Sequence, residues 1–310
     1  MPDLPVASAA EQAGSDHDHT LPRIGFVGAG RVGVVLAAAF VQAGWAVTAA
    51  SSRRQELRDR FASTVPGART FSEPAAVLDE ADLVFLTVPD DAIGPVAATL
   101  RLYSGQGLVH TSGLLSASVL EPARAAGTTQ ASFHPLVAFA DTERALSDLR
   151  GATVALDGDA DLVAMLSELA EAIGAQPVAL PPGAKPAYHA AAVLAAGGFV
   201  ALLDGIAEIG RGAGMDERGA LAIYAPLIRQ SLANAERLGV AAALTGPMVR
   251  GDAGTVRAHL DALARLAPGA MELYVAVARR ETRLAEERGE LGADRAAALR
   301  DLLAAATIRD

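Results

Sequence analysis

The sequence predicts an α/β protein, with a doubly wound, mostly parallel sheet in its first half and helices alone in its second. Three observations predict this class: a glycine-rich turn between an apolar strand and a helix, alternating strand and helix patterns up to about residue 180, and long Ala- and Leu-rich segments beyond. A length of 310 residues favours two domains, because one hydrophobic core rarely supports so long a chain. We expect a disordered tail at residues 1–21, an α/β domain at 22–180 and a helical domain at 181–310.

The composition limits the classes of partner. Hydrophobic residues make up 51% of the chain and the net charge is −10, which suits a well-packed globule without a basic field for nucleic acid. The chain has no cysteine, which excludes disulfides, thiolate metal sites and a cysteine nucleophile. We therefore expect a cytoplasmic protein with no nucleic-acid partner.

Two segments bear on targeting and metal binding. The first 21 residues are small, polar and acidic, and they lack the positive start and apolar run of a secretory signal. His17 and His19 lie in this tail, where histidines are far more often solvated than metal-bound, so we expect no metal site. The longest apolar stretch, Ala190–Leu203, is too short and too rich in Gly and Ala to span a bilayer, so we expect no membrane association.

The glycine-rich turn has the context of a dinucleotide-binding site. An apolar strand, Ile24–Val27, is followed by the Gly28-Ala-Gly-Arg-Val-Gly33 turn and then by a helix. In such a turn the first glycine permits the tight bend, Gly30 lets the backbone approach a pyrophosphate, and Gly33 allows the helix to pack closely on the strand. The N-terminus of the helix would supply oriented amide groups to the phosphates.

The end of the next expected strand, Trp45–Ala50, favours NADP(H) over NAD(H). An NAD site normally places a carboxylate there, whereas this chain has Ser51, Ser52, Arg53 and Arg54. Hydroxyl and guanidinium groups suit a 2′-phosphate. The alternative is that one or both arginines, Arg54 in particular, are solvated residues that open the next helix.

Three further expected strands end in small or polar residues that would face the same crevice. They are followed by Val88-Pro89-Asp90, by His110-Thr-Ser-Gly113 and by His134-Pro135. The residues that we predict to bind the cofactor are Gly28, Ala29, Gly30, Arg31, Val32, Gly33, Ser51, Ser52, Arg53, Val88, Pro89 and Asp90.

Beyond Pro181 the strand pattern stops and two polar groups interrupt the helical segments. The first expected helix places Lys185 and His189 one turn apart on one face, where each can exchange protons or serve a structural role. A Gly/Pro loop at residues 244–252 contains Arg250, a natural anchor for a carboxylate, and Asp252, which we interpret as a helix cap.

Taken together, the motifs resemble the Rossmann-like family known as domain of unknown function 2520, over residues 24 to about 266. The motifs are Gly28-Ala-Gly-Arg-Val-Gly33, Val88-Pro-Asp-Asp91, His110-Thr-Ser-Gly113, Ser132-Phe-His-Pro135, Tyr188-His-Ala-Ala191, Leu244-Thr-Gly-Pro247 and Arg250-Gly-Asp252. The resemblance implies kinship with 6-phosphogluconate, 3-hydroxyisobutyrate, ketopantoate and pyrroline-carboxylate reductases. It also implies that Lys185 is the proton donor, by its position on the first long helix of the second domain.

Two departures leave the substrate open. Ketopantoate reductases have an asparagine where this chain has His189, and relatives often have Ser-Asn where it has Gly197-Gly198. His134-Pro135 is also similar to a His-Pro pair of prephenate dehydrogenases. The alternatives are therefore an imine reductase of the pyrroline-5-carboxylate type, a prephenate-like dehydrogenase, or a non-catalytic NADPH-binding regulator.

The working hypothesis is NADPH-dependent reduction of a small 2-oxo acid such as 2-dehydropantoate. The predicted catalytic residues are Lys185, His189, His134 and Ser112, and the predicted substrate-binding residues are Arg250, Thr245 and Asn234. Apolar helices at Ala190–Ile209 and Ala220–Leu238 predict a homodimer through the C-terminal half.

Overall fold

The computed structural model describes residues 21–125 and 127–307, so the predicted tail lies almost wholly outside the described residues. The chain divides into two compact units, Met1–Ala192 and Val193–Asp310. The sequence placed this division at residue 181, just before a helix. The division falls later because the first turns of that helix bond to the sheet, as described below.

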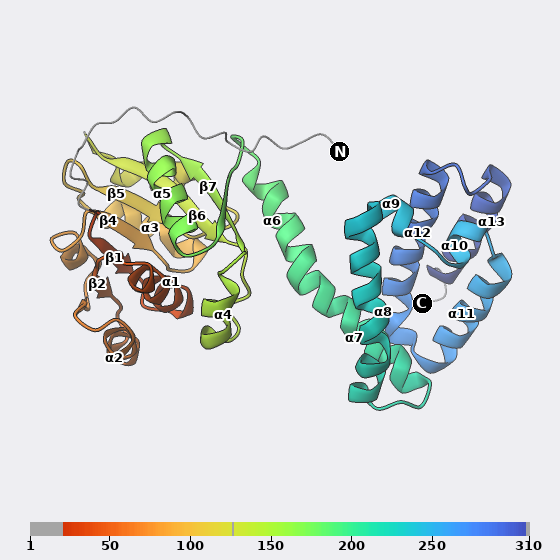
Figure 1. Ribbon diagram of the computed structural model, residues 1–310. Coiled ribbons are helices and arrows are strands. Elements are labelled where there is room, and N and C mark those ends of the chain that lie inside the picture. The colour runs from red at the N-terminus through yellow and green to blue at the C-terminus, as the bar shows by residue number, and fades with distance from the viewer. Residues whose placement is uncertain (1–20, 126, 308–310) are drawn as a thin grey trace. The chain divides into compact units, whose positions relative to one another are not determined.

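The first unit is built on one eight-stranded sheet (Figure 1). Its strand order is β3-β2-β1-β4-β5-β6-β7-β8, and every neighbouring pair is parallel except β6 and β7. The order reverses beside β1, which places a ligand crevice at the carboxyl ends of the strands. The strands are β1 (Ile24–Val27), β2 (Val47–Ser51), β3 (Arg69–Phe71), β4 (Leu83–Leu86), β5 (Gly107–His110), β6 (Thr129–Pro135), β7 (Thr153–Gly158) and β8 (Gln176–Ala179).

Helices cover both faces of this sheet. Neighbouring strand residues such as Phe26 and Val27 point to opposite faces, so each face has a separate apolar core. Helices α1 and α5 pack on one face, and α3, η1 and η2 pack on the other. The helical elements are α1 (Arg31–Gln42), α2 (Gln55–Thr64), η1 (Pro74–Val77), α3 (Asp90–Thr99), η2 (Ala117–Ala123), α4 (Thr142–Asp148), α5 (Ala160–Ala172) and α6 (Lys185–Val193).

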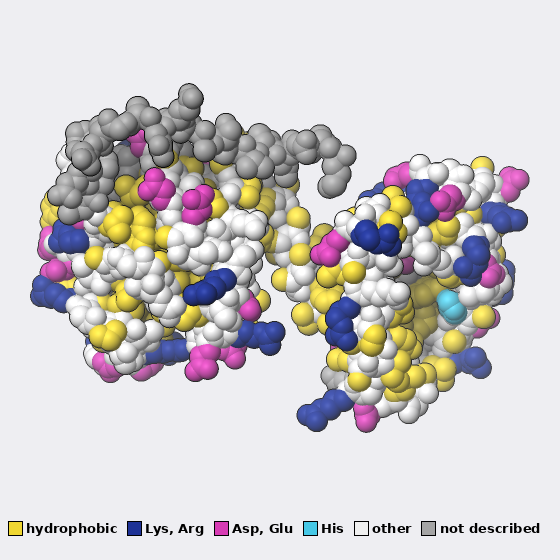
Figure 2. All heavy atoms as spheres, viewed as in Figure 1, with side chains coloured by type: hydrophobic (Ala, Val, Ile, Leu, Met, Phe, Trp, Pro, Cys, Tyr) yellow, Lys and Arg dark blue, Asp and Glu magenta, His cyan; other side chains and the backbone are white. Residues whose placement is uncertain are grey.

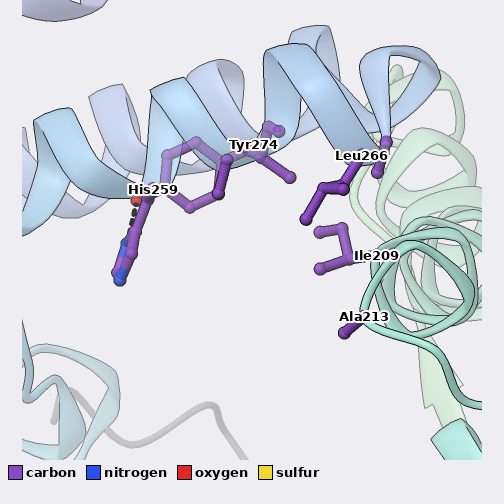
Figure 3. Close-up of a pocket in the computed structure, with 8 residues that line it drawn as sticks. Ile209, Ala213, His259, Leu266 and Tyr274 are labelled. Atoms are coloured by element: carbon purple, nitrogen blue, oxygen red, sulfur yellow. Dashed lines mark hydrogen bonds between the residues drawn. The ribbon is translucent and has the colours of Figure 1, made fainter.

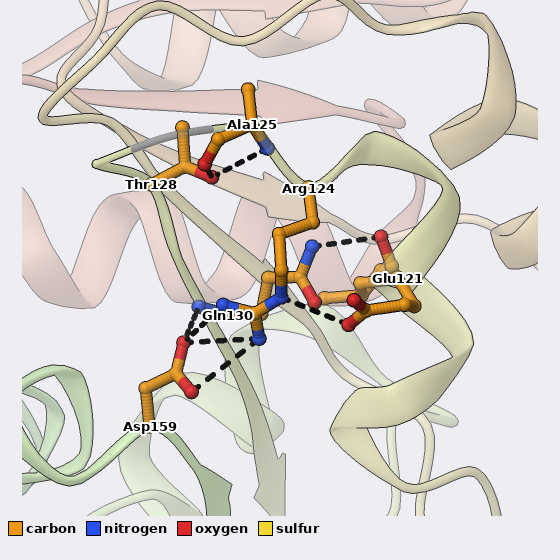
Figure 4. A network of polar contacts seen from close by, with 7 residues as sticks. Glu121, Arg124, Ala125, Thr128, Gln130 and Asp159 are labelled. Carbon is orange, nitrogen blue, oxygen red and sulfur yellow. Dashed lines mark hydrogen bonds and ion pairs between the residues drawn. The ribbon is translucent and has the colours of Figure 1, made fainter.

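A polar network fixes the start of β6 (Figure 4). The carboxylate of Asp159 accepts hydrogen bonds from the backbone N–H of Gln130 at 2.8 Å and from the guanidinium of Arg124 at 3.2 Å. Arg124 also pairs with Glu121, and the buried Gln130 amide donates to the carbonyl of Leu120 at 2.8 Å. The network joins β6 to η2 and to the junction of β7 with α5. It therefore holds the strand that carries Ser132 and His134.

The second unit is all-helical, as the sequence predicts. Its core lies between α10, α11, α12 and α13, where Met248, Val256 and Leu299 are buried. Its elements are η3 (Leu194–Gly198), α7 (Phe199–Gly212), α8 (Glu217–Leu238), α9 (Val240–Ala243), α10 (Pro247–Arg250), α11 (Ala253–Leu266), η4 (Pro268–Ala270), α12 (Met271–Glu287) and α13 (Ala293–Thr307).

Helix α6, the π-turn η3 and α7 form one helical run, Lys185–Gly212. This run has 28 residues, so it is longer than the apolar stretch expected from the sequence, and its mean hydropathy reaches 1.9 with 11% of that window buried. By length and composition alone it passes the test for a membrane-spanning helix. A single helix of this kind is weak evidence, because core helices of soluble proteins pass the same test.

Candidate functional site

The glycines of the turn between β1 and α1 have two different roles, because some are needed for the local packing and one faces open space. Gly28 has φ of +114°, and a Cβ there would lie 2.6 Å from the Thr87 carbonyl oxygen. A Cβ on Gly33 would lie 2.4 Å from the Gly28 carbonyl oxygen, whereas one on Gly30 would meet no described atom within 4 Å. The geometry therefore requires Gly28 and Gly33 for the turn and its packing, and leaves open space beside Gly30.

The start of α1 fits a pyrophosphate in that open space. Gly30 is the N-cap residue, and neither a side-chain cap nor an acidic residue accompanies the first turn, which begins at Arg31. The backbone N–H groups of this turn, from Arg31 through Val32, thus remain available to an anion at the positive end of the helix dipole. With Ala29 buried beneath them, these residues could hold the phosphates of a dinucleotide.

The end of β2 offers cationic groups and no carboxylate. Arg58, which the sequence analysis did not single out, donates to the carbonyl of Ser52 at 2.6 Å and so holds the turn. Arg54 stands at the N-cap position of α2 and pairs with Glu56 at 2.7 Å, which agrees with its interpretation as a residue that opens the helix. Arg53 is exposed and directly follows Ser52, where it could reach a phosphate.

Four further predicted cofactor residues follow or end β2 and β4, the two strands that flank β1. Ser51 is buried, and its hydroxyl has no hydrogen-bond partner among the described residues. Val88 and Pro89 follow β4, and Pro89 directly precedes α3. Asp90 starts α3 and accepts a hydrogen bond from the Ser112 hydroxyl at 2.6 Å, so its carboxylate bonds to protein rather than standing free.

A second set of polar side chains lies where β5 and β6 end and α6 begins, and we call it the strand-end cluster. All of its members belong to the first unit. The members are Ser112, Ser132, His134, Lys185, Tyr188 and His189.

Lys185 is the buried cation of the strand-end cluster. Its side chain is 2% exposed, and its ammonium donates to the Ser112 carbonyl at 2.8 Å and to the Ser132 hydroxyl at 2.7 Å. Burial lowers the pKa of Lys185 to about 8, against the opposing effect of Asp157 and Asp90. The amine is therefore close to its titration point at neutral pH, as a proton donor requires.

Ser112 supports this lysine through its backbone. Its hydroxyl donates its proton to Asp90 and accepts from the backbone N–H groups of Leu114 at 3.1 Å and Leu115 at 3.0 Å. With these bonds in place the hydroxyl has no proton left for a substrate oxygen. We therefore propose that Ser112 holds Lys185 in place and does not contact the substrate itself.

The two predicted histidines lie together beside Gly113. Their rings are edge-to-face, with centroids 5.8 Å apart, and His134 Nδ1 lies 3.1 Å from the Tyr188 hydroxyl. A Cβ on Gly113 would lie 2.4 Å from His189 Nδ1 and 2.7 Å from His134 Nε2, so any larger residue would have to displace the rings. Burial, with the charge of Lys185, lowers the pKa of His134 to about 4.

Another histidine beneath the cluster was not predicted. His110 is fully buried, accepts the backbone N–H of Ser112 at Nδ1, and bonds to the Ser116 carbonyl through Nε2, each at 3.2 Å. Because Nδ1 accepts, the ring proton is on Nε2 and the ring is neutral. Burial and the charge of Lys185 lower its pKa to about 4. The signal available in the sequence was its position at the end of a strand, two residues before Ser112.

The predicted substrate-binding residues belong to the second unit. Arg250 ends α10 and is exposed, and Thr245 lies in the loop before it. Asn234 lies on α8, where its amide oxygen accepts from Arg237 at 3.4 Å. Asp252 accepts the backbone N–H of Thr255 and caps α11, which confirms its interpretation as a cap.

The second unit also contains an apolar cavity of about 310 Å³ between α7, α11 and α12 (Figure 3). His259 and Tyr274 form its one polar pair, with 2.8 Å between His259 Nδ1 and the Tyr274 hydroxyl. Burial raises the pKa of Tyr274 to about 12. Leu266 and Ile209 line the opposite side. Arg250 does not line this cavity.

The fold and the glycine turn define a Rossmann-type dinucleotide-binding unit followed by a helical unit. Residues 9–135 match a Rossmann-like domain, and residues 152–281 match the domain of unknown function DUF2520. Both matches agree with the resemblance that the motifs of the chain indicate. No curated protein sequence matches the chain.

Several solved structures are similar over most of the chain. Protein TM1727 from Thermotoga maritima is 28% identical, with a TM-score of 0.67 over 86% of this chain and 99% of the other. An imine reductase from Pseudomonas sp. is 20% identical, with a TM-score of 0.63 over 92% and 100%. A reductive aminase from Aspergillus terreus, in complex with NADPH, is 16% identical, with a TM-score of 0.59 over 93% and 94%.

These likenesses show that the chain shares its fold with these proteins. The predictions of an oxidoreductase and of NADP(H) as its cofactor agree with this fold, because these neighbours are reductases and one of them was solved with NADPH. The prediction of a ketopantoate-like substrate is not tested by them.

Proposed function

We propose that the chain is an NADPH-dependent reductase of a small 2-oxo acid, of which 2-dehydropantoate is the leading candidate. The observation that carries this proposal is the buried Lys185 ammonium at the carboxyl edge of the same sheet that carries the glycine turn. Lys185 is also the only lysine among the 26 Lys and Arg residues of the chain. Every other Lys or Arg position of the chain is an arginine, which cannot lose its proton near neutral pH. The amine at position 185 therefore favours a role that needs a titratable group.

The bound cofactor would supply the hydride, and the chain's own residues would bind and orient it. The open backbone at Gly30 and the start of α1 suit its pyrophosphate. Ser52 and Arg53 suit a 2′-phosphate, which favours NADP(H) over NAD(H). These are the same groups that the sequence predicts.

Lys185 would donate the proton that the substrate oxygen takes up when the carbonyl carbon is reduced. Two of its three N–H bonds are used by Ser112 and Ser132, which leaves one for a substrate. Its positive charge also stabilises a developing alkoxide before the proton moves. His134 and His189 lie beside Gly113 in the same cluster, where a ring N–H can donate a hydrogen bond.

Arg250 is the residue that we propose to bind the carboxylate of the acid. Arg250 is an exposed guanidinium at the end of a short helix, which suits two parallel hydrogen bonds to a carboxylate. Thr245 and Asn234 are proposed as additional polar contacts. This assignment is separable from that of Lys185, because substitution of Arg250 would raise KM more than it lowers kcat.

We also propose that the protein is a homodimer through the helical half. Large apolar side chains are exposed along η3, α7 and α8, including Leu194 at 71%, Val200 at 64% and Leu232 at 61% (Figure 2). A second copy that covers them would account for this surface in a soluble, cytoplasmic protein. Sedimentation velocity distinguishes a dimer from a monomer or a detergent-requiring protein.

The experiment that tests the proposed reaction is NADPH absorbance decay with purified protein and a substrate panel. The panel contains 2-dehydropantoate, other branched 2-oxo acids and pyrroline-5-carboxylate, and prephenate is tested with NADP. Turnover of 2-dehydropantoate with NADPH, and slower turnover with NADH, is the expected result. Turnover of none of the 2-oxo acids would overturn the substrate assignment.

The second candidate is reduction of a cyclic imine. It is favoured by structural neighbours that include an imine reductase and a pyrroline-5-carboxylate reductase from Streptococcus pyogenes. Turnover of pyrroline-5-carboxylate in the same panel would select it, and prephenate oxidation would select a prephenate-like dehydrogenase. NADPH binding without any turnover would instead point to a cofactor-binding regulator.

A further inference from the structure

Tyr188 makes a contact that the proposed reaction does not yet use. It lies on the first turn of α6, and its hydroxyl oxygen is 3.1 Å from Nδ1 of His134, which β6 carries. The two rings meet edge-to-face with their centroids 5.7 Å apart. The contact joins residues 54 positions apart in the sequence, so it depends on the docking of α6 against the sheet.

The direction of this hydrogen bond follows from the state of both groups. Burial raises the pKa of Tyr188 to about 12 and, with Lys185, lowers the pKa of His134 to about 4. At neutral pH a phenol therefore meets a neutral imidazole. The bare nitrogen of a neutral imidazole is a better acceptor than a phenol oxygen, so the hydroxyl donates to Nδ1.

The opposite side of the His134 ring faces a defined position. Nε2 lies 2.7 Å, and His189 Nδ1 lies 2.4 Å, from the point where a Cβ of Gly113 would stand. Both nitrogens thus border the same small volume. His189 Nδ1 is buried and has no hydrogen-bond partner among the described residues, so it is an unused acceptor or donor on that side.

We propose that Tyr188 is a positioning residue, which donates to His134 Nδ1 and so places the imidazole proton on Nε2, toward Gly113 and His189. A ring with this tautomer offers a donor to the side where His189 Nδ1 lacks a partner. It also offers no bare nitrogen that would compete for the proton of Lys185. The catalytic meaning of this arrangement rests on the proposed function, but the tautomer itself does not.

The tautomer is measured directly by ¹⁵N–¹H spectra of the histidine rings in the full-length protein at pH 7. His134→Gln assigns the His134 signals. The expected result is a neutral ring with its proton on Nε2 in the unsubstituted protein. A proton on Nδ1 would mean that Tyr188 accepts rather than donates, and would overturn the proposal.

Tyr188→Phe keeps the ring and removes only the hydroxyl. It should produce a mixture of the two His134 tautomers and raise the pKa of His134 by about one unit, since a hydrogen bond to the neutral form is worth about 1 kcal/mol. Tyr103→Phe is the matched control, because its hydroxyl bonds to Asp79 at 2.7 Å outside the cluster. An unchanged tautomer in Tyr188→Phe would also overturn the proposal.

Kinetics give a second readout once a substrate is known. Tyr188→Phe should lower kcat about tenfold and leave KM within about twofold, because the hydroxyl acts through His134 rather than on the substrate. A rise in KM with unchanged kcat would show that Tyr188 contacts the substrate instead. The ring spectra need no substrate, so failure of the proposed reaction and failure of this inference give different results.

Discussion

Two polar regions lie at the carboxyl edge of the sheet, and they differ in how far their polar groups are buried and bonded within the protein. In the strand-end cluster, polar groups are buried and bond to one another, with Lys185 held by Ser112 and Ser132. At the glycine turn and the end of β2, by contrast, the backbone beside Gly30 is open and Arg53 is exposed. Most polar groups of the first region bond within the protein, whereas the second region leaves its backbone and its guanidinium open to a ligand.

The two regions differ because catalytic groups and cofactor-binding groups have different requirements. Groups that take part in chemistry gain from fixed positions and shifted pKa values, which burial and internal hydrogen bonds provide. Groups that bind a charged cofactor must remain free to reach it. Substitutions in the strand-end cluster should therefore change turnover, stability or pKa, whereas substitutions at the end of β2 should change only cofactor affinity.

The largest effect is expected for Lys185→Ala. Loss of the proton donor and of its charge should lower kcat about 1,000-fold while NADPH affinity stays within about twofold. NADPH turnover and fluorescence titration measure the two quantities. Lys185→Arg is the control, because it keeps a cation that cannot donate a proton near neutral pH.

The titration of Lys185 can be followed separately. As the only lysine, it gives a single side-chain signal after ¹³Cε-lysine labelling. Burial lowers its pKa to about 8, so the signal should titrate near pH 8 and activity should fall as pH rises through that value. A titration near pH 10.5 would show that the amine is exposed to water, and would contradict the burial of Lys185 in the strand-end cluster.

The next largest effect is expected for Gly113→Ala. Its Cβ would collide with both His134 and His189, and displacing these rings should lower kcat about 100-fold with little change in NADPH affinity. Gly94→Ala is the matched control, since its added Cβ would meet only Val119 at 3.5 Å. Equal activity of the two variants would show that the histidines are not needed in these positions.

Sequence and structure agree most closely where the determinants are local. The roles of Gly28, Gly30 and Gly33 follow from a strand, a turn and a helix in one short segment, and the structure gives each glycine the expected environment. The edge strand Arg69–Phe71 was missed because three residues carry too little pattern. Likewise, nothing in the sequence indicated that β7 runs antiparallel to β6.

The cluster could be predicted only in part. The sequence identified Lys185, His134, His189 and Ser112. The two hydrogen-bond partners of Lys185, however, lie 53 and 73 positions away from it in the sequence. The bond to Ser132 and the engaged hydroxyl of Ser112 depend on tertiary docking, which periodicity does not encode. The same docking explains why the structural division falls within α6 rather than at the Pro-rich break before it.

An intermediate effect is expected on acid stability through His110. Its pKa is about 4 in the folded state and about 6.5 when unfolded, so between these values the unfolded chain binds more protons and stability falls as pH falls. From pH 7 to pH 5 the loss should be about 2 kcal/mol from this residue. His110→Asn should remove this part of the pH dependence.

Trp45 provides the probe for that measurement. It is the only tryptophan of the chain and is buried in the core of the first unit, so its fluorescence follows the unfolding of the unit that contains His110. Urea unfolding at pH 7 and pH 5 gives the difference for each protein. The same pH dependence in His110→Asn would mean that His110 is already protonated in the fold or that other groups dominate.

The smallest effect is expected at the open region, for Arg53→Ala. An exposed guanidinium that bonds to a 2′-phosphate should contribute about tenfold to NADPH affinity and nothing to NADH affinity, because NADH lacks that phosphate. Arg54→Ala is the matched control, since Arg54 pairs with Glu56 and should leave both affinities unchanged. Calorimetric titration of both cofactors into both variants measures this. Equal losses for NADPH and NADH would assign Arg53 to the shared part of the cofactor, and a change in kcat at saturating NADPH would contradict the separation of the two regions.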